Sequence, residues 1–522
     1  MARPRVVLER NVVVKNWKRA DLRLCLCSPS PYEVGFLNLA LQILYGLWNE
    51  REDVLCERAF VNVLGGALSL ESRRSLREFD VLAFSVHYEA ELVGLVNMLR
   101  AAGIPPLARD RRPGEHPILI AGGPVVTENP RPLERVFDCL FIGEVEDVSD
   151  ELLDALKEAS EARSLDPLAD LPHVYVPGLS CNRIRRAFVR DLNESYYPTA
   201  QFRPEGLRVA FGPAFLLEVS RGCSYKCRFC LARQIYRPMR VRRLPRLLEI
   251  LDEGLERTAT DRVSVISFAA SDHPELTEIL ESLLARGVSF TIPSLRVDRA
   301  PARALELLRE SGQVSVTVAP EVASERLADA LGKGIRPEEV IELGKDLRKL
   351  GFSRLKLYFM VGVPGEREGE AAAIGRLARG VRELGFSRVT VAINPLIPKP
   401  HTPLQWAPYV GERDYRRRVE LVRREAGRGV RLSGLEGPEG LLEVAGARGG
   451  PEVGEALASA SAEGRLSRRR ALLVVKELLR RDARPVLGYP LEAELPWEVV
   501  DVGVRRGEVV SEYERFLEAL SR

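Results

Sequence analysis

A chain of 522 residues is too long for one ordinary domain, and its length predicts two to four. Its 77 basic and 74 acidic residues nearly cancel, which excludes a global electrostatic case for nucleic-acid binding but leaves a local basic patch open. Charges interrupt the apolar runs of positions 1–20, and no uncharged stretch approaches the ~20 residues of a membrane-spanning helix. We therefore expect a soluble, cytoplasmic protein with no signal peptide and no membrane partner. Eight cysteines in so long a chain favour metal binding or chemistry over a disulfide scaffold.

Short apolar runs alternate with helical patterns in the first region, residues 1–160. Strands are expected at 22–27, 81–86, 117–121 and 139–142, and helices at 34–48 and 89–102. This alternation predicts a doubly wound, mostly parallel, Rossmann-like α/β sheet. Ligands of such sheets bind beyond the carboxyl ends of the strands. The candidate binding residues at those ends are Ser85, His87, Gly122, Gly123 and Gly143.

A second region, residues 206–410, repeats a strand followed by a helix six times. Its strands are expected at 214–219, 263–268, 288–292, 314–319, 355–361 and 389–394. Six such units predict a partial (βα)6 barrel, because the usual closed barrel needs eight, and functional residues should lie at the strand carboxyl ends. The proline-rich residues 161–205 are interpreted as a linker, and residues 411–522 as a mostly helical accessory region.

Three cysteines, Cys223, Cys227 and Cys230, follow the first strand of the predicted barrel. Thiolates at this spacing on one loop can hold a single metal centre, and soft thiolates select zinc, copper(I) or an iron–sulfur cluster. A structural zinc site normally has four ligands, and the next cysteine or histidine along the chain is His273. Three thiolates on a four-iron cluster would leave one iron open for a substrate or cofactor.

The segment from Cys223 to Cys230 resembles the Cys-x3-Cys-x-aromatic-Cys signature of the radical S-adenosylmethionine (SAM) superfamily, with Phe229 as the aromatic residue. The resemblance implies that the three cysteines hold a [4Fe–4S] cluster and that SAM chelates the fourth iron. It also implies an electron donor such as ferredoxin or flavodoxin, whose electron would cleave SAM to a 5′-deoxyadenosyl radical.

The resemblance continues at the ends of the next four strands of the second region. The matching residues are Ser271 and Asp272, then Ser294 and Arg296, then Glu321 and Ser324, and finally Gly362 and Pro364. It implies that Ser271 and Asp272 contact the methionine amino group, and that Ser294 and Arg296 contact the carboxylate or ribose. Glu321 and Ser324 would contact the ribose, and the turn with Gly362 and Pro364 would lie against adenine.

The first region resembles the cobalamin-binding-like domain that precedes many radical SAM cores, in segments 28–49, 79–92, 118–130 and 138–147. The Asp-x-His-x-x-Gly motif, whose histidine ligates cobalt, is missing from the sequence. Either cobalamin binds without that ligand, or the domain has lost it. His87 is a candidate ligand, although a histidine at a strand end is more often structural.

These resemblances favour cobalamin-assisted methylation of an unactivated carbon. Two other radical SAM functions stay open: a methylthiotransferase acting on RNA or a ribosomal protein, and a non-methylating enzyme whose first domain has lost cobalamin. The methylthiotransferase needs a second cluster, for which Cys25 or Cys27, Cys56 and Cys139 are available. A zinc- or cluster-stabilised binding module is the non-enzymatic alternative. The substrate, whether protein, RNA or small molecule, is not encoded in any of these patterns.

Overall fold

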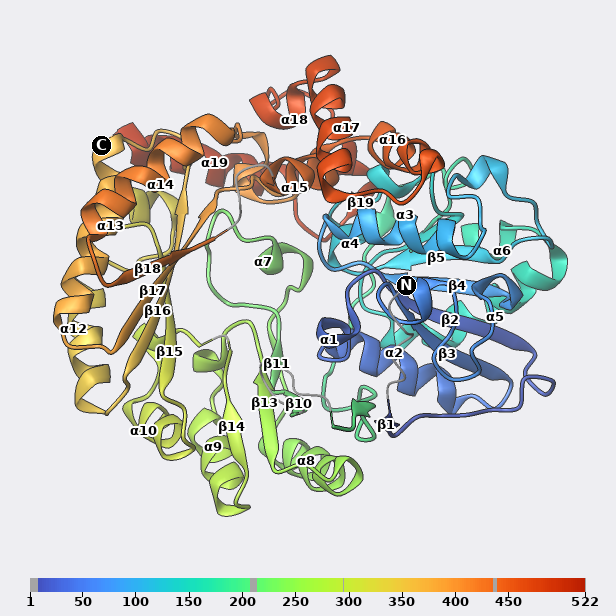
Figure 1. Ribbon diagram of the computed structural model, residues 1–522, viewed down its shortest axis with the longest axis horizontal. Helices are drawn as coiled ribbons and strands as arrows, with labels where there is room; N and C mark the ends of the chain where they lie inside the picture. Colours follow the sequence, from blue (N-terminus) through green and yellow to red (C-terminus); the bar gives the residue numbers. More distant parts are fainter. Residues whose placement is uncertain (1–7, 207–213, 294, 435–438, 522) are drawn as a thin grey trace.

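The computed structural model describes residues 8–206, 214–293, 295–434 and 439–521 (Figure 1). Ser294, one of the expected SAM contacts, lies outside the described residues. A twisted sheet formed by the first part of the chain lies beside a curved array of strands formed by the middle part, and the last helices run along one edge of both (Figure 1). No helix of the described ranges is long and apolar enough to span a membrane.

The first sheet has six strands in the order β3-β2-β4-β5-β6-β7, and all neighbours are parallel except β6 and β7. The strands are β2 (Leu22–Ser28), β3 (Val54–Phe60), β4 (Val81–Ser85), β5 (Ile118–Gly122), β6 (Cys139–Phe141) and β7 (Val174–Tyr175). The helices packed on it include α2 (Leu39–Glu50), α3 (Glu91–Ala101) and α5 (Ser149–Ala162). Because helices cover both faces, the central strands are buried on both sides and read as continuous apolar runs.

The helix expected at 34–48 is two helices, α1 (Tyr32–Gly35) and α2. The Asn38 side chain accepts a hydrogen bond from the Ala40 amide at 2.9 Å and so begins α2 with an N-cap. A Cβ on Gly35 would come within 2.5 Å of the Phe60 ring, so α1 packs directly against β3. The apolar pattern concealed the break because residues on both sides of it are buried in the same core.

The second array consists of two parallel sheets with outer helices. One contains β10 (Phe215–Glu218), β13 (Arg262–Ile266) and β14 (Ser289–Thr291); the other contains β15 (Ser315–Glu321), β16 (Arg354–Val361), β17 (Arg388–Pro395) and β18 (Val430–Ser433). The outer helices are α8 (Leu244–Thr258), α9 (Leu276–Ala285), α10 (Ala302–Glu310), α11 (Glu325–Leu331), α12 (Pro337–Lys349), α13 (Glu368–Glu383) and α14 (Glu412–Ala426). The six expected strands are present, and β18 adds one more from the region expected to be mostly helical.

Burial alternates along these strands with period two. In β16, Leu355, Leu357 and Phe359 are buried in the core under the outer helices, whereas Lys356 and Tyr358 are only half-buried. Successive side chains of a strand point to opposite faces, so Lys356 and Tyr358 lie on the inner, concave face of the array.

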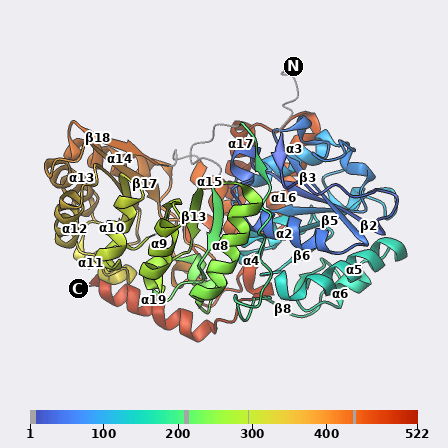
Figure 2. The same ribbon diagram turned by 90° about the horizontal axis from the view of Figure 1, so that it is seen from below.

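The segments that flank the two sheets tie them together. Within residues 161–205, β8 (Ile184–Arg185) pairs with β19 (Val500–Asp501), and β9 (Arg203–Pro204) pairs with β1 (Glu9–Arg10). The accessory helices α15 (Glu439–Arg448), α16 (Glu452–Ala460) and α17 (Arg468–Arg481) pack onto the core of the first sheet. The last helix, α19 (Arg506–Ser521), packs along α11 of the second array (Figure 2).

A buried charge cluster lies where these parts meet. Lys399, which follows β17, forms ion pairs with Glu89, with Glu443 at 3.2 Å and with Glu128 at 3.6 Å. Burial alone would lower the pKa of Lys399, but the three carboxylates outweigh it and raise that pKa well above its ordinary value. The ammonium group therefore stays charged and stabilises carboxylates from the first sheet and from α15.

We expect the Lys399→Met variant to lose about 3–5 kcal/mol of unfolding free energy, because buried carboxylates then have no cation. The loss should be larger at pH 8 than at pH 5, since the folded protein must keep these carboxyl groups protonated and that costs more as the pH rises. Urea unfolding at both pH values measures it. Lys349→Met, at a side chain 76% exposed, is the matched control. Equal stability of the two variants would contradict the prediction.

Candidate active site

The three cysteines lie on the loop between β11 (Ser220–Arg221) and α7 (Leu231–Ile235). Gly222 opens this loop with a φ of +87°, and a Cβ there would come within 2.4 Å of the Tyr236 carbonyl oxygen, so only glycine fits. Cys227 is buried, and Cys223 and Cys230 are half-buried. The loop therefore carries one buried and two half-buried cysteines on one short stretch of backbone.

Contacts to two distant helices hold the cysteine loop in place. The Arg228 amide donates to the Leu331 carbonyl at 2.9 Å, and its guanidinium donates to the Ala330 carbonyl at 2.7 Å, both at the end of α11. The same guanidinium forms an ion pair with Glu512 of α19 at 3.0 Å. One side chain between the second and third cysteines thus anchors the loop to both helices.

Burial and a nearby positive charge shift the pKa values of the Cys223 and Cys227 thiols in opposite directions. Burial raises the pKa of Cys227 to about 11 and also raises the pKa of Cys223, while the nearby cation of Lys333 lowers both. At neutral pH these thiols are therefore protonated, and metal binding here must release protons. In the described ranges, no three His, Cys, Asp or Glu side chains form a group placed to hold one metal ion, so the three thiols of this loop do not converge on a single point in the structure.

Two of the expected SAM residues surround this loop. Asp272 accepts hydrogen bonds from the hydroxyls of Ser224 and Tyr225, the latter at 2.5 Å. The Arg296 guanidinium lies 4.1 Å from the centre of the Tyr225 ring and forms an ion pair with Asp298. The ends of β13 and β14 are thereby brought to the cysteine loop, with Tyr225 between them. Tyr225 is a site residue that sequence reasoning missed.

Three other expected SAM residues, Glu321, Ser324 and Ser271, differ in their hydrogen-bond and ion-pair partners. Glu321 has a φ of +71° and pairs with Lys333 at 3.4 Å, and burial raises the pKa of its carboxyl. The Ser324 hydroxyl caps α11 and donates to Glu370 at 2.7 Å, so that side chain already has two partners. Ser271 Oγ is buried and has no hydrogen-bond partner among the described residues, which leaves it available to a ligand.

The turn after β16 contains Gly362 and Pro364. Gly362 has a φ of +83°, and a Cβ there would lie 2.4 Å from Val410. Its amide donates to the buried Glu366 carboxylate at 2.6 Å, which fixes the turn. Phe229 packs with an apolar cluster that includes Val363 and Phe516.

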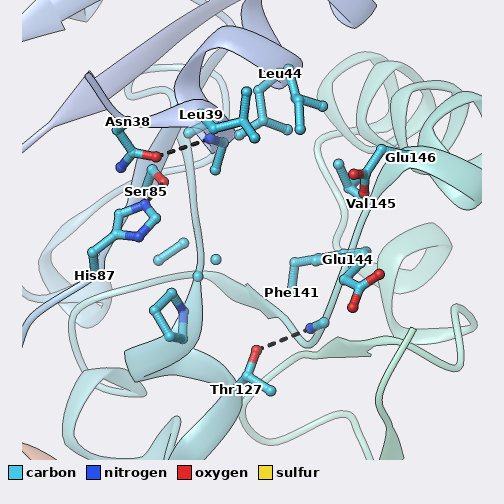
Figure 3. Close-up of a pocket in the computed structure, with 18 of the residues that line it drawn as sticks. Asn38, Leu39, Leu44, Ser85, His87, Thr127, Phe141, Glu144, Val145 and Glu146 are labelled. Carbon is cyan, nitrogen blue, oxygen red and sulfur yellow. Dashed lines mark hydrogen bonds between the residues drawn. The ribbon is translucent and has the colours of Figure 1, made fainter. Parts of the chain in front are cut away.

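A cavity of about 420 Å³ lies at the carboxyl ends of the first sheet (Figure 3). Ser85, His87, Gly122, Gly123 and Gly143 all line it. Its other walls include Asn38, Leu39 and Leu44 of α2 and its cap, and Arg221, Tyr236 and Phe268 from the second array. The cavity therefore lies between the first sheet and the cysteine loop.

Of the three glycines that line the cavity, Gly123 and Gly143 have no room for a side chain, whereas Gly122 has. A Cβ on Gly123 would lie 2.4 Å from the Val86 carbonyl oxygen, and one on Gly143 would lie 2.1 Å from that of Ala187. Both also have positive φ, of +110° and +114°. A Cβ on Gly122 would meet no atom closer than 3.7 Å, so its missing side chain keeps the cavity open.

His87 is a neutral, hydrogen-bonded side chain in this cavity. Its ring lies against Ser85, with Nε2 2.7 Å from Ser85 Oγ (Figure 3). Its backbone amide donates to Glu91 at 2.7 Å. Burial lowers its pKa to about 4. The imidazole therefore carries no charge at neutral pH.

Buried ion pairs connect the cavity wall to the cysteine loop. Glu144, which follows β6 and lines the cavity, accepts from Arg221 at 3.1 Å and from Arg240 at 2.8 Å. Arg221, two residues before the first cysteine, also pairs with Glu218 and Glu146, each at 2.8 Å. Every side chain in this group is less than 10% exposed, so the pairs are shielded from solvent screening.

Two family descriptions match the chain, one on each sheet. Residues 40–177 match the N-terminal family of radical SAM proteins, and residues 217–378 match the radical SAM superfamily. An uncharacterized protein of Methanocaldococcus jannaschii, MJ0966, is 30% identical over 382 residues, which are 73% of this chain and 79% of that protein. The chain belongs to the radical SAM superfamily.

This radical SAM protein also resembles methyltransferases. The uncharacterized methyltransferase PH0819 of Pyrococcus horikoshii is 26% identical over 295 residues, which are 53% of this chain and 61% of that protein. TsrM from Kitasatospora setae, a radical SAM methyltransferase solved with cobalamin and a [4Fe–4S] cluster, matches with a TM-score of 0.54 at 13% identity, over 87% of this chain and 99% of that one. OxsB, a cobalamin-dependent SAM radical enzyme solved with aqua-cobalamin and SAM, matches with a TM-score of 0.50 at 14% identity, over 96% of this chain and 80% of that one. The expected fold class is confirmed.

The structure separates the cysteines that a second cluster would need. Cys25 and Cys27 lie in the core on one face of the first sheet, and Cys56 and Cys139 lie in the core on the opposite face. All four are at most 1% exposed. They cannot converge on one cluster without unfolding the sheet, which disfavours a methylthiotransferase in this radical SAM protein.

We expect acid to destabilise the folded protein through His87. Its folded pKa of about 4 lies below the ordinary value of 6.5, so the unfolded state binds the proton more tightly and stability falls as the pH drops from 6.5 to 4. This histidine contributes up to about 3 kcal/mol to that fall. Urea unfolding across this range should show a shallower fall for His87→Gln than for the unchanged protein. An identical slope would contradict the prediction.

Proposed function

We propose that this radical SAM enzyme holds a [4Fe–4S] cluster on Cys223, Cys227 and Cys230 and uses cobalamin to methylate an unactivated carbon. The observation that carries the proposal is the cavity between the sheet ends and the cysteine loop, whose wall is joined to that loop by buried ion pairs. The likeness to methyltransferases supports the transfer of a methyl group.

The residues around the loop fit a cluster that binds SAM. Three thiols on one loop are soft donors that suit iron–sulfur chemistry. When bound, the cluster supplies the electron that cleaves SAM. Lys333 and Arg296 place positive charge beside Cys227 and favour its thiolate form, which offsets the cost of burying negative charge.

Each SAM group then has a candidate partner. The Asp272 carboxylate, already held by two hydroxyls, can accept from the methionine ammonium, and the free Ser271 hydroxyl lies beside it. The Arg296 guanidinium can bind the methionine carboxylate. Glu321 at the end of β15 can accept from the ribose hydroxyls, and the turn at Gly362 can lie against adenine. Ser324 is a weaker candidate because its hydroxyl is already engaged.

The cavity residues fit a bound corrinoid. Its walls combine glycine backbone with apolar side chains such as Leu39 and Leu44, which exclude water and offer a flat macrocycle an apolar surface. When bound, cobalamin supplies the methyl group. His87 can position the cofactor through Ser85, but its Nε2 is engaged there, so we assign it no bond to cobalt. A ferredoxin or flavodoxin is the proposed electron source.

Replacing any of Cys223, Cys227 or Cys230 by alanine should reduce iron from about four atoms per chain to near zero. Formation of 5′-deoxyadenosine should be lost with it, because SAM cleavage needs the cluster electron. Anaerobic reconstitution, iron analysis and product chromatography measure both. Cys181→Ala, at an exposed cysteine away from the loop, is the matched control and should keep both properties. A triad variant that still forms 5′-deoxyadenosine would overturn the cluster assignment.

Gly122→Leu should abolish cobalamin binding, because the new side chain fills the cavity while its Cβ meets no atom within 3.7 Å. Iron content and SAM cleavage should persist, since the cysteine loop is unchanged. Gly369→Leu is the matched control, because a Cβ there meets nothing within 4 Å. The visible spectrum of protein equilibrated with cobalamin measures binding. An unchanged chain that cleaves SAM but retains no cobalamin would favour the non-methylating enzyme.

A further inference from the structure

A second cavity, of about 460 Å³, lies on the inner face of β16, β17 and β18. Its lining includes Lys356, Tyr358 and Ala392 from the strands, Tyr88 from the loop after β4, and Glu443 from α15. Its size is within the range of small-molecule sites. Tyr88 directly follows His87, which lines the first cavity, so adjacent residues of one loop reach both cavities.

Three side chains of this second cavity, Lys356, Tyr358 and Tyr88, can donate further hydrogen bonds. Among the residues that the structure describes, Lys356 forms no ion pair, and its ammonium donates only to Tyr358 Oη at 2.7 Å. That bond leaves the Tyr358 hydroxyl proton free to donate elsewhere. Tyr88 Oη is buried and has no hydrogen-bond partner in the described ranges. A buried hydroxyl without a partner is unfavourable, so the arrangement favours a ligand that accepts hydrogen bonds.

The carboxylate in this cavity does not neutralise Lys356. Glu443 pairs with Lys399 at 3.2 Å, and burial raises the pKa of its carboxyl. Glu443 shares Lys399 with Glu89 and Glu128, and no ion pair joins it to Lys356. Lys356 is therefore a cation of the cavity without a carboxylate partner among the described residues.

We propose that this cavity binds the substrate, and that the substrate is a small molecule with a carboxylate or phosphate group held by Lys356, Tyr358 and Tyr88. This inference rests on the proposed function, since it places the substrate on the barrel's inner face beside the cobalamin cavity. The anion accepts from one ammonium and two hydroxyls. The remainder of the substrate then extends from this anchor toward the cysteine loop.

The test uses the full chain, reconstituted with its cluster and with SAM present. Calorimetry measures the binding of phenyl phosphate, benzoate and the neutral benzyl alcohol. One of the two anions should bind at least about tenfold more tightly than the alcohol, because hydrogen bonds between charged partners are stronger than those to a neutral hydroxyl. Tighter binding of phenyl phosphate assigns a phosphate, and tighter binding of benzoate assigns a carboxylate.

Lys356→Met should weaken binding of the preferred anion by about tenfold or more, and Tyr88→Phe by about fivefold. Lys356→Arg should preserve most of the binding, because it keeps the charge. Lys345→Met, at an exposed lysine of α12, is the matched control and should change nothing. Unchanged thermal midpoints show that the variants fold.

Three results would overturn the proposal: equal binding of anions and alcohol, full anion binding by Lys356→Met, or a loss of SAM affinity in that variant. The last would show that Lys356 holds SAM rather than the substrate. Formation of 5′-deoxyadenosine is measured on the same samples. Protein that binds the anion through Lys356 yet forms no 5′-deoxyadenosine keeps the anion site and refutes the proposed function. Protein that forms 5′-deoxyadenosine but does not bind the anion through Lys356 keeps the proposed function and refutes the anion site.

Discussion

The active-site geometry depends on one buried carboxylate, that of Glu144. Burial alone would raise its pKa, but Arg240 and Arg221 outweigh that cost and hold the pKa below its ordinary value. A buried carboxylate that loses such partners is strongly destabilising, so the three side chains must stay together. Glu144 follows β6 of the first sheet, whereas the two arginines lie in a short antiparallel strand pair, Ser220–Arg221 with Arg240–Val241, that leads into the cysteine loop and follows it. Their contact therefore fixes the separation between the sheet edge and the cysteine loop.

A second charged group fixes the same boundary from another side. Lys399 binds Glu89 and Glu128 of the first part of the chain and Glu443 of α15. Apolar surfaces can slide over one another at little cost, whereas charges out of water tolerate few arrangements. The relative position of the two parts is therefore fixed by the direction and length of these ion pairs as well as by the apolar area that the parts bury. The two cavities lie along this boundary, and each takes walls from both sides.

Local patterns were enough to predict β2, β4, β5 and β6 of the first sheet, the six strands of the partial barrel and five residues that line the first cavity, but not β3 or β7. Period-two alternation and glycines at strand ends can be recognised in a few neighbouring residues. Parallel topology then brings the carboxyl ends of the strands together at one edge of the sheet. Glu144 and Arg240 are 96 positions apart, and no local pattern links them. The break at Asn38 was missed because both flanking segments are apolar. Strand β18 was missed because it has four residues and gains its order only from pairing with β17.

The anchoring of the cysteine loop by α19 has a consequence for biosynthesis. Arg228 and its partner Glu512 are 284 positions apart. At ribosomal rates of about 5–20 residues per second, α19 is completed roughly 15–60 seconds after the cysteines. During that interval the loop lacks this support, and the nascent thiols face the cellular iron and oxygen without it. The contacts that hold the cysteine loop are therefore complete only after α19 has been synthesised.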